Sequence, residues 1–331
     1  MLRRTFLASA AAASTAVAAP PRCRMGIAAT CYLTVWRPKD SFQFLEHCDA
    51  LGAGGVQTPL TSLDPEYLKK FRARAEQSGM YVEVMAPLPK GDLAVFERTI
   101  QAAKAVGADR VRAGALAGRR YETFSTLDEW KSFVAESKAA IERAVPVLER
   151  NKVRMALENH KDWTVEEHVA LLKSYNSEYL GALIDTGNNI SLLDDPMQVI
   201  RELAPFAVAT HVKDMGVNEY PEGFLLSEMP LGDGMLDMQA VIDIIRKARP
   251  DVRMTLETIT RDPLKIPVLT EKYWATFPDR KATRLAATMA MVRKNKMELP
   301  GLAGLSREMQ LRLEDDNVKR SLHYGRTRLG L

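Results

Sequence analysis

Residues 153–160, VRMALENH, form a short apolar run that ends in a carboxylate, an amide and an imidazole. The segment 180–188, LGALIDTGN, follows it along the chain and is a second apolar run that ends in Asp185. Continuous apolar runs of this length are typical of buried parallel strands, because helices cover both faces of a parallel sheet. The two runs therefore predict neighbouring parallel strands with polar residues at their carboxyl ends.

Further short β-like runs alternate with helical stretches on both sides of this pair. Eight strands are predicted in all, at residues 26–31, 54–57, 81–85, 109–113, 153–157, 179–184, 207–210 and 252–256. This α/β alternation predicts parallel pairing with right-handed crossovers, and the number of strands matches a closed (β/α)8 TIM barrel over residues 25–280. Residues 281–331 predict a C-terminal helical tail, which we expect to pack on the barrel or on a second subunit of a homo-oligomer.

An open, doubly wound sheet is the alternative architecture. It would require a glycine-rich phosphate turn after the first strand, and residues 28–32, AATCY, do not supply one. The segment 215–237, between the last two predicted strands, is rich in glycine and proline and is expected to be a long loop over the active-site mouth.

Composition excludes several classes of protein. The chain has 331 residues, 46% of them hydrophobic and 27% charged, which is typical of a globular protein rather than a disordered or coiled-coil one. The formal net charge is +4, and no dense basic stripe with interleaved aromatic residues is present, so we expect no nucleic-acid partner. After the first twenty residues no apolar run is long enough to predict a membrane span.

Residues 1–24 are predicted to be a signal peptide and leader. Arg3 and Arg4 precede a weakly apolar, alanine-rich stretch that ends in small residues, as in a signal of the twin-arginine type. This predicts a periplasmic or secreted protein, and a merely disordered alanine-rich start is the alternative. No lipobox precedes Cys23, so no lipid anchor is expected. The three cysteines match no zinc-binding pattern, and the sequence leaves open whether Cys31 and Cys48 pair.

Four predicted strands end in a residue that can bind a metal ion. These residues are Glu158, Asp185, His211 and Glu257. A single carboxylate in such a position is more often a helix cap, and a single histidine is equally often a buried structural residue. In a barrel, however, the carboxyl ends of successive strands meet at one rim, so the four together predict a shared site. Three carboxylates and one imidazole suit one divalent ion, with Mn²⁺ or Mg²⁺ favoured and Co²⁺ or Zn²⁺ as alternatives.

These segments resemble the xylose isomerase-like barrel superfamily. The runs LENH (157–160), IDTGN (184–188) and HVKD (211–214) are similar to its sugar isomerase/epimerase branch, and GAGGVQ (52–57) and PLGDG (230–234) are similar to its early and late signatures. The resemblance covers residues 25–280 and implies a small carbohydrate or keto-sugar as substrate. Asn188 stands where the ketose epimerase branch usually carries a histidine, which favours a reaction other than free-ketose epimerisation.

The resemblance also implies a mechanism. A metal ion held by the four residues would polarise a substrate carbonyl and stabilise an enediolate, while Glu158 and Glu257 act as the acid/base pair. Five further residues are predicted to bind substrate: His160, Lys213, Asn188, Gln57 and Arg112. For Gln57 and Arg112 a structural role is the stronger alternative.

Three functions remain open on the sequence alone. The first is a metal-dependent sugar isomerase or epimerase. The second is a lyase or dehydratase of the same fold that acts on a keto-sugar, a keto-polyol or a 3-keto-glycoside, a reading that predicted export favours. The third is a non-catalytic sugar-binding barrel, which the complete set of four ligands disfavours.

Overall fold

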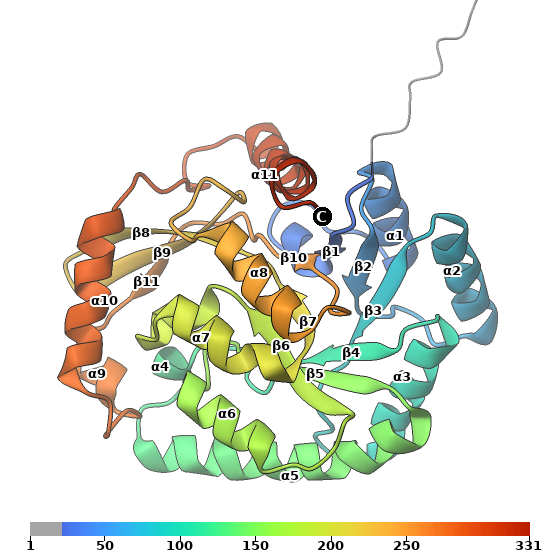
Figure 1. Cartoon of the computed structure of the whole chain (residues 1–331), viewed down its shortest axis with the longest axis horizontal. Helices are drawn as coiled ribbons and strands as arrows, with labels where there is room; N and C mark the ends of the chain where they lie inside the picture. The colour runs from blue at the N-terminus through green and yellow to red at the C-terminus, as the bar shows by residue number, and fades with distance from the viewer. Residues whose placement is uncertain (1–21) are drawn as a thin grey trace, which may run out of the picture.

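The structure, a computed structural model, describes residues 22–331, and the predicted signal peptide lies almost entirely outside these residues. Its centre is a sheet of eight parallel strands in the order β10-β1-β2-β3-β4-β5-β6-β7 (Figure 1). The strands are β1 (Gly26–Ala28), β2 (Gly55–Thr58), β3 (Tyr81–Met85), β4 (Arg110–Ala113), β5 (Arg154–Glu158), β6 (Leu180–Asp185), β7 (Ala207–His211) and β10 (Thr255–Leu256). A parallel bridge between Val212 and Leu256 joins the two edges, so the predicted TIM barrel is confirmed.

Helices surround the sheet as the alternating pattern predicts (Figure 1). They are α1 (Ser41–Ala50), α2 (Pro65–Gln77), α3 (Leu93–Ala105), α4 (Arg120–Thr123), α5 (Leu127–Asn151), α6 (Val165–Lys173), α7 (Pro196–Leu203), α8 (Met238–Ala248), α9 (Glu271–Trp274), α10 (Ala282–Asn295) and α11 (Arg307–Arg328). Short 3-10 helices lie at Ala29–Tyr32, Asn188–Leu192 and Ala204–Phe206.

Local sequence sets the ends of the helices. Thr126 begins α5 and Thr164 begins α6, each in a reciprocal capping box with the glutamate three residues later. At the other end, Gly79 after α2 and Gly107 after α3 have φ of 62° and 85°, a left-handed conformation that glycine adopts without a steric penalty. These signals stop each helix where the chain must turn back into the next strand.

The segment predicted as a loop over the mouth contains regular structure instead. β8 (Asp214–Tyr220) and β9 (Gly223–Met229) form an antiparallel hairpin, and β11 (Leu264–Ile266) adds a third strand to it. The hairpin buries Val217, Phe224 and Leu226 in a second hydrophobic cluster, which α10 and the chain near α9 complete. These apolar side chains must be covered by other apolar side chains, and a solvated loop would leave them exposed to water. Their burial therefore favours paired strands over a loop.

The C-terminal helix α11 lies between α8 and the N-terminal part of the barrel (Figure 1). Arg246 of α8 donates hydrogen bonds to the carbonyls of Leu329 and Gly330, just after α11. On the other side, the carboxylate of Glu314 accepts hydrogen bonds from the backbone N–H groups of Val35 and Trp36. The end of the chain therefore packs on the barrel, in the place of the eighth helix of the ring.

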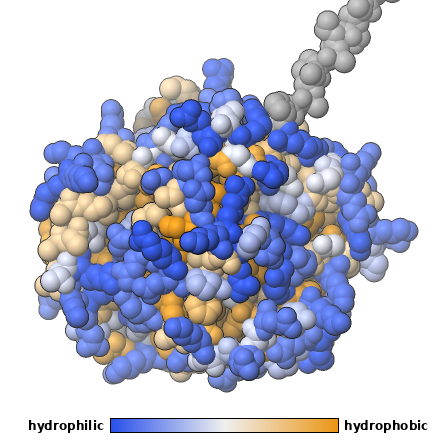
Figure 2. Space-filling model, in the orientation of Figure 1, coloured by the Kyte–Doolittle hydropathy of each residue, from blue (hydrophilic) through white to orange (hydrophobic). Residues whose placement is uncertain are grey.

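The described part of the chain has a mostly polar exterior over an apolar interior. Figure 2 shows hydrophilic residues over most of the visible face, with apolar ones mainly in the gaps between them.

The three cysteines, Cys23, Cys31 and Cys48, are all buried and unpaired, so the described residues contain no disulfide. None of the helices described is both long and apolar enough to cross a membrane.

Candidate metal centre and active site

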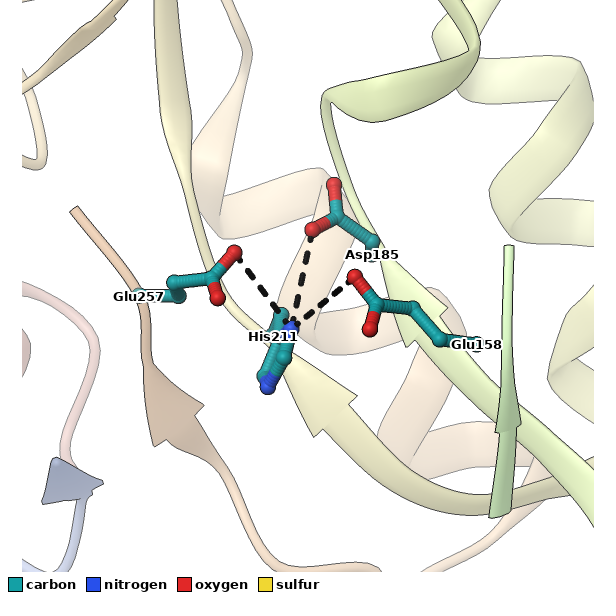
Figure 3. Close-up of side chains that lie close together, drawn as sticks. All are labelled: Glu158, Asp185, His211 and Glu257. Carbon is teal, nitrogen blue, oxygen red and sulfur yellow. Dashed lines mark ion pairs between the residues drawn. The ribbon is translucent and has the colours of Figure 1, made fainter. Parts of the chain in front are cut away.

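The four predicted ligands converge at the carboxyl ends of the strands. Glu158, Asp185 and His211 are the last residues of β5, β6 and β7, and Glu257 directly follows β10. One ligand atom from each lies within 4.8 Å of the others, and all four residues are buried. In Figure 3 the three carboxylates point at His211 from different sides. Parallel pairing produces this convergence, because it brings the ends of neighbouring strands to one rim, with Asp185 directly opposite His211.

The imidazole of His211 faces the carboxylates through Nδ1. This atom lies 3.4 Å from an oxygen of Glu158, 3.7 Å from Asp185 Oδ2 and 3.4 Å from Glu257 Oε2. On the opposite side of the ring, Nε2 lies 2.6 Å from Gln57 Oε1. The Gln57 amide is oriented in turn by Glu83, whose carboxylate accepts its Nε2–H at 3.0 Å. We assign a proton to Nε2, so the neutral ring that binds a metal ion would direct its Nδ1 lone pair at the centre of the cluster.

The cluster fits a divalent metal ion. His211 Nδ1 and Asp185 Oδ2 are both buried, and neither has a hydrogen-bond partner among the described residues, although Lys213 Nζ lies 3.0 Å from Asp185 Oδ2. Three carboxylates and one imidazole are donors that Mg²⁺, Mn²⁺ or Zn²⁺ accept. Without a metal, burial opposes protonation of His211, but Glu257 and Glu158 outweigh it and raise its pKa to about 9. The site thus attracts a positive charge, which a metal ion would supply.

Cationic side chains hold two of the carboxylates in place. Lys213 Nζ lies 2.5 Å from Glu257 Oε2, and Arg112 Nε donates to Glu158 Oε2 at 2.7 Å. Burial alone would raise the pKa of Glu158, yet the charges of Arg112 and His211 hold it well below the ordinary value. Thr30 completes the frame, because its hydroxyl donates to Glu257 Oε1 at 2.5 Å. Both carboxylates are therefore ionised and fixed in orientation.

A cavity of about 620 Å³ opens beside the cluster. Its polar lining comprises Thr30, Lys90, Arg112, Arg119, Glu122, Glu158, His160, Lys161, Lys213, Glu257 and Arg261, and its apolar lining includes Leu33, Met85, Leu116 and Ile259. The volume suits a small sugar-sized ligand. A larger open groove of about 960 Å³ lies between α5, α6 and the α9–α10 connection, and it contains none of the four ligands.

The residues predicted to bind substrate fall into two groups. Arg112, His160 and Lys213 line the cavity. Asn188 lies behind Glu158, to which its Nδ2 donates at 3.2 Å, and Gln57 lies behind His211. The last two are thus placed to orient ligands rather than to line the cavity.

Further residues at and beside the cavity were not predicted from the sequence, among them Lys161 and Arg261, which line it, and Glu228, which lies beside it. Lys161 directly follows His160, so its place after a strand was an available signal. Glu228 lies on β9, where its carboxylate pairs with Arg261 Nη2 at 2.6 Å and lies 3.6 Å from Lys213 Nζ. No local pattern identifies Glu228, because the antiparallel hairpin that brings it to the rim was not predicted from the sequence. Arg261 is recognised only through its ion pair with Glu228.

Comparisons with known proteins agree with this fold. The profile of the xylose isomerase-like TIM barrel family matches residues 45–287. The 3-oxo-isoapionate decarboxylase of Pectobacterium atrosepticum is 26% identical over 248 residues, which cover 70% of this chain and 85% of that protein. A D-psicose 3-epimerase, solved in the presence of D-fructose, matches with a TM-score of 0.61 at 14% identity, over 93% of this chain and 99% of the other.

A metal-containing structure is also similar. A xylose isomerase-like TIM barrel protein from Mycobacterium smegmatis, in complex with magnesium, has a TM-score of 0.51 and 17% identity over 74% of this chain and 88% of the other. At these low identities the solved structures are evidence for the fold alone.

Proposed function

The chain belongs to the xylose isomerase-like TIM barrel family, and we propose that it is a divalent-metal-dependent isomerase or epimerase of a keto-sugar. One observation carries the proposal: Glu158 and Glu257 both line the cavity, and an oxygen of each lies 3.4 Å from His211 Nδ1. Two carboxylates on either side of a shared centre are placed to remove a proton from one face of a carbon and return it to the other.

The residues of this chain would divide the work of such a reaction. A divalent ion held by Glu158, Asp185, His211 and Glu257 supplies Lewis-acid polarisation of a carbonyl, which acidifies the C–H bond beside it. Glu158 or Glu257 would take that proton and leave an enediolate on the substrate. Lys213, whose ammonium is already in the site, would stabilise the negative charge that develops on the substrate oxygens.

A lyase is the second candidate, and the sequence relative favours it. The relative is a decarboxylase by name and matches over most of its length. Decarboxylation of a β-keto acid with a hydroxyl on its α-carbon yields the same type of enediolate: the C–C bond to the carboxylate breaks, its electron pair remains on the substrate, and CO₂ leaves. One proton from solvent then forms the new C–H bond. Glu158 and Glu257 would be needed in this case to deliver that proton rather than to remove one.

An experiment in D₂O separates the two candidates. Metal-loaded protein is offered ketoses, 3-keto-glucosides and sugar-derived keto acids, and products are followed by mass spectrometry. Deuterium in a product of otherwise conserved mass supports the isomerase or epimerase. Release of CO₂, water or an aglycone supports the lyase. Glu257→Gln should abolish either reaction, whereas Glu222→Gln, an exposed substitution on the β8–β9 turn, should not.

Absence of both exchange and product with every compound, in protein shown to hold its metal, would overturn the proposal. It would then favour the non-catalytic sugar-binding barrel.

We further propose that the protein is exported. The support is the sequence of residues 1–24, in which Arg3 and Arg4 precede an alanine-rich stretch with small residues at its end. Mass spectrometry of protein from a periplasmic fraction should give a chain that begins near residue 20, and Arg3→Lys/Arg4→Lys should keep the precursor in the cytoplasm. Normal export of this double variant would contradict a twin-arginine signal.

A further inference from the structure

Lys161 is a buried cation without an anionic partner. Its side chain lines the cavity, and only 3% of the residue is exposed. Among the described residues its ammonium forms no ion pair, and its recorded contact is a hydrogen bond to Asn188 Oδ1. The other cations deep in the cavity each have a carboxylate partner: Arg112 pairs with Glu158, Lys213 with Asp185 and Glu257, and Arg261 with Glu228.

An ammonium without an anionic partner is costly in this environment, because burial removes its hydration and the hydrogen bond to Asn188 replaces that hydration only in part. Burial, together with the charge of Lys213, lowers the pKa of Lys161 to about 8. At neutral pH the group is still mostly protonated. A neutral sugar would leave this charge unpaired, whereas a carboxylate would neutralise it and form a charge-assisted hydrogen bond.

The position of Lys161 relates it to the metal centre. Asn188 Oδ1 accepts hydrogen bonds from Lys161 and, at 3.4 Å, from Lys213. Lys213 in turn contacts Asp185 and Glu257. The Lys161 ammonium therefore lies one amide group beyond the metal ligands. A substrate with its carbonyl at the metal centre would reach Lys161 with a group only a few carbons away.

We propose that Lys161 binds the carboxylate of the substrate, and that the substrate is a sugar-derived keto acid rather than a neutral ketose. The inference rests on the proposed function, because it places the carbonyl of the same molecule at the metal centre. One free ammonium balances a single negative charge, and the neighbouring cations are already paired, so a carboxylate fits better than a phosphate dianion. In the lyase reaction, a carboxylate separated from the carbonyl by one carbon is also the group that departs.

Matched ligands test the proposal by binding alone. 2-Keto-D-gluconate differs from D-fructose only in carrying a carboxylate at C1, and 5-keto-D-gluconate differs from L-sorbose only in carrying one at the far end. Calorimetric titration of metal-loaded protein should give tighter binding of the acid in at least one pair, by about tenfold or more. Fructose 6-phosphate serves as the phosphate probe and should bind no better than D-fructose.

Variants assign the preference to Lys161. Lys161→Met should abolish the preference for the acid, and Lys161→Arg, which keeps the charge, should retain part of it. Lys69→Met is the control, because Lys69 is exposed on α2 and does not line the cavity, and this variant should keep the full preference. Thermal unfolding of each variant shows whether it is folded. If Lys161→Met does not fold, Lys161→Arg still tests the assignment, because it should lower the preference for the acid without abolishing it.

The possible failures are distinguishable. Equal, metal-dependent binding of acid and ketose, or a preference that survives in Lys161→Met, would overturn the carboxylate subsite and leave the proposed function intact. Tighter binding of fructose 6-phosphate than of both keto acids would also overturn it. Binding of none of these compounds by metal-loaded protein would overturn the subsite and the proposed function together.

Discussion

The two ends of the barrel carry opposite arrangements of the same kinds of charge. At the amino ends of the strands, the single carboxylate of Asp109 is surrounded by three arginines, Arg110, Arg154 and Arg253. At the carboxyl ends, the single imidazole of His211 is surrounded by three carboxylates. Both clusters combine residues from the ends of several strands, so the barrel brings side chains together at either end.

The clusters differ in whether other residues of the protein satisfy their buried polar atoms. Arg110 is buried, and it donates to Asp109 through Nε and Nη2 and to the carbonyl of Val208 through Nη1. Although burial opposes ionisation, Arg110 and Arg253 hold the pKa of Asp109 well below its ordinary value. His211 Nδ1, by contrast, has no hydrogen-bond partner among the described residues. A completed cluster stabilises the fold, and an incomplete one is arranged for a ligand that the chain does not provide.

The largest effect should follow from removing one charge at the carboxyl end. Asp185→Asn keeps the shape of the side chain but replaces a carboxylate ligand with an amide, so metal affinity should fall by more than about 100-fold, a larger loss than for residues that only orient ligands. Turnover should fall by about 1,000-fold or more. Metal titration and steady-state assays measure these losses, and Asp195→Asn, at an exposed helix cap, is the control. Near-normal metal affinity would mean that the cluster is not a metal centre.

The corresponding change at the amino end should affect stability instead. Asp109→Ala leaves the buried guanidinium of Arg110 without its carboxylate, and the free energy of unfolding should fall by about 2–3 kcal/mol, less than for a fully buried pair because Asp109 is partly exposed. Urea denaturation measures this loss. Folded Asp109→Ala protein should bind metal as the parent does. A large loss of metal affinity in the folded variant would contradict the separation of the two ends.

Loss of the group that orients His211 should lower metal affinity less than loss of a direct ligand does. Gln57→Leu removes the acceptor of the Nε2 proton, so the imidazole loses its fixed tautomer and angle, and metal affinity should fall by about 10- to 100-fold. Competition with a chelator measures the affinity. Gln239→Leu, an exposed substitution on α8, should leave it unchanged. An unchanged affinity in Gln57→Leu would show that the strand alone positions His211.

A second buried imidazole, that of His168, should give the smallest effect. Unlike His211, it has no carboxylate within ion-pair distance among the described residues, so it shows how a buried histidine titrates without such partners. Neither nitrogen of His168, on α6, has a hydrogen-bond partner among the described residues, and burial lowers its pKa to about 4, although Glu158 opposes the shift. An unfolded histidine has a pKa of about 6.5, so between these values the unfolded chain binds more protons. Stability is therefore fully present above pH 6.5 and is lost progressively toward pH 4.

Between pH 7 and 5.5 this loss should amount to about 1 kcal/mol. The measurement is the free energy of unfolding at both pH values in the parent and in His168→Leu, where this share of the pH dependence should disappear. Identical pH dependence in the two proteins would mean that His168 is not held neutral.

Most of the barrel and the four residues of the cluster at its rim were accessible from the sequence, for a physical reason. Buried parallel strands must be apolar, so the polar residues that end these runs, such as Glu158 and Asp185, stand out locally. The hairpin β8–β9 was not predicted, because its strands depend on an apolar cluster shared with α10, far along the chain.

What the sequence by itself determined is therefore the eight barrel strands, their parallel order and the four side chains that meet at the rim. Only the tertiary structure decided which other residues contact those side chains. Gln57 reaches His211 across 154 positions, and Lys161 meets Lys213 through an amide of a third segment, Asn188. Such contacts depend on closure of the barrel and on the packing of its loops, which no local periodicity encodes.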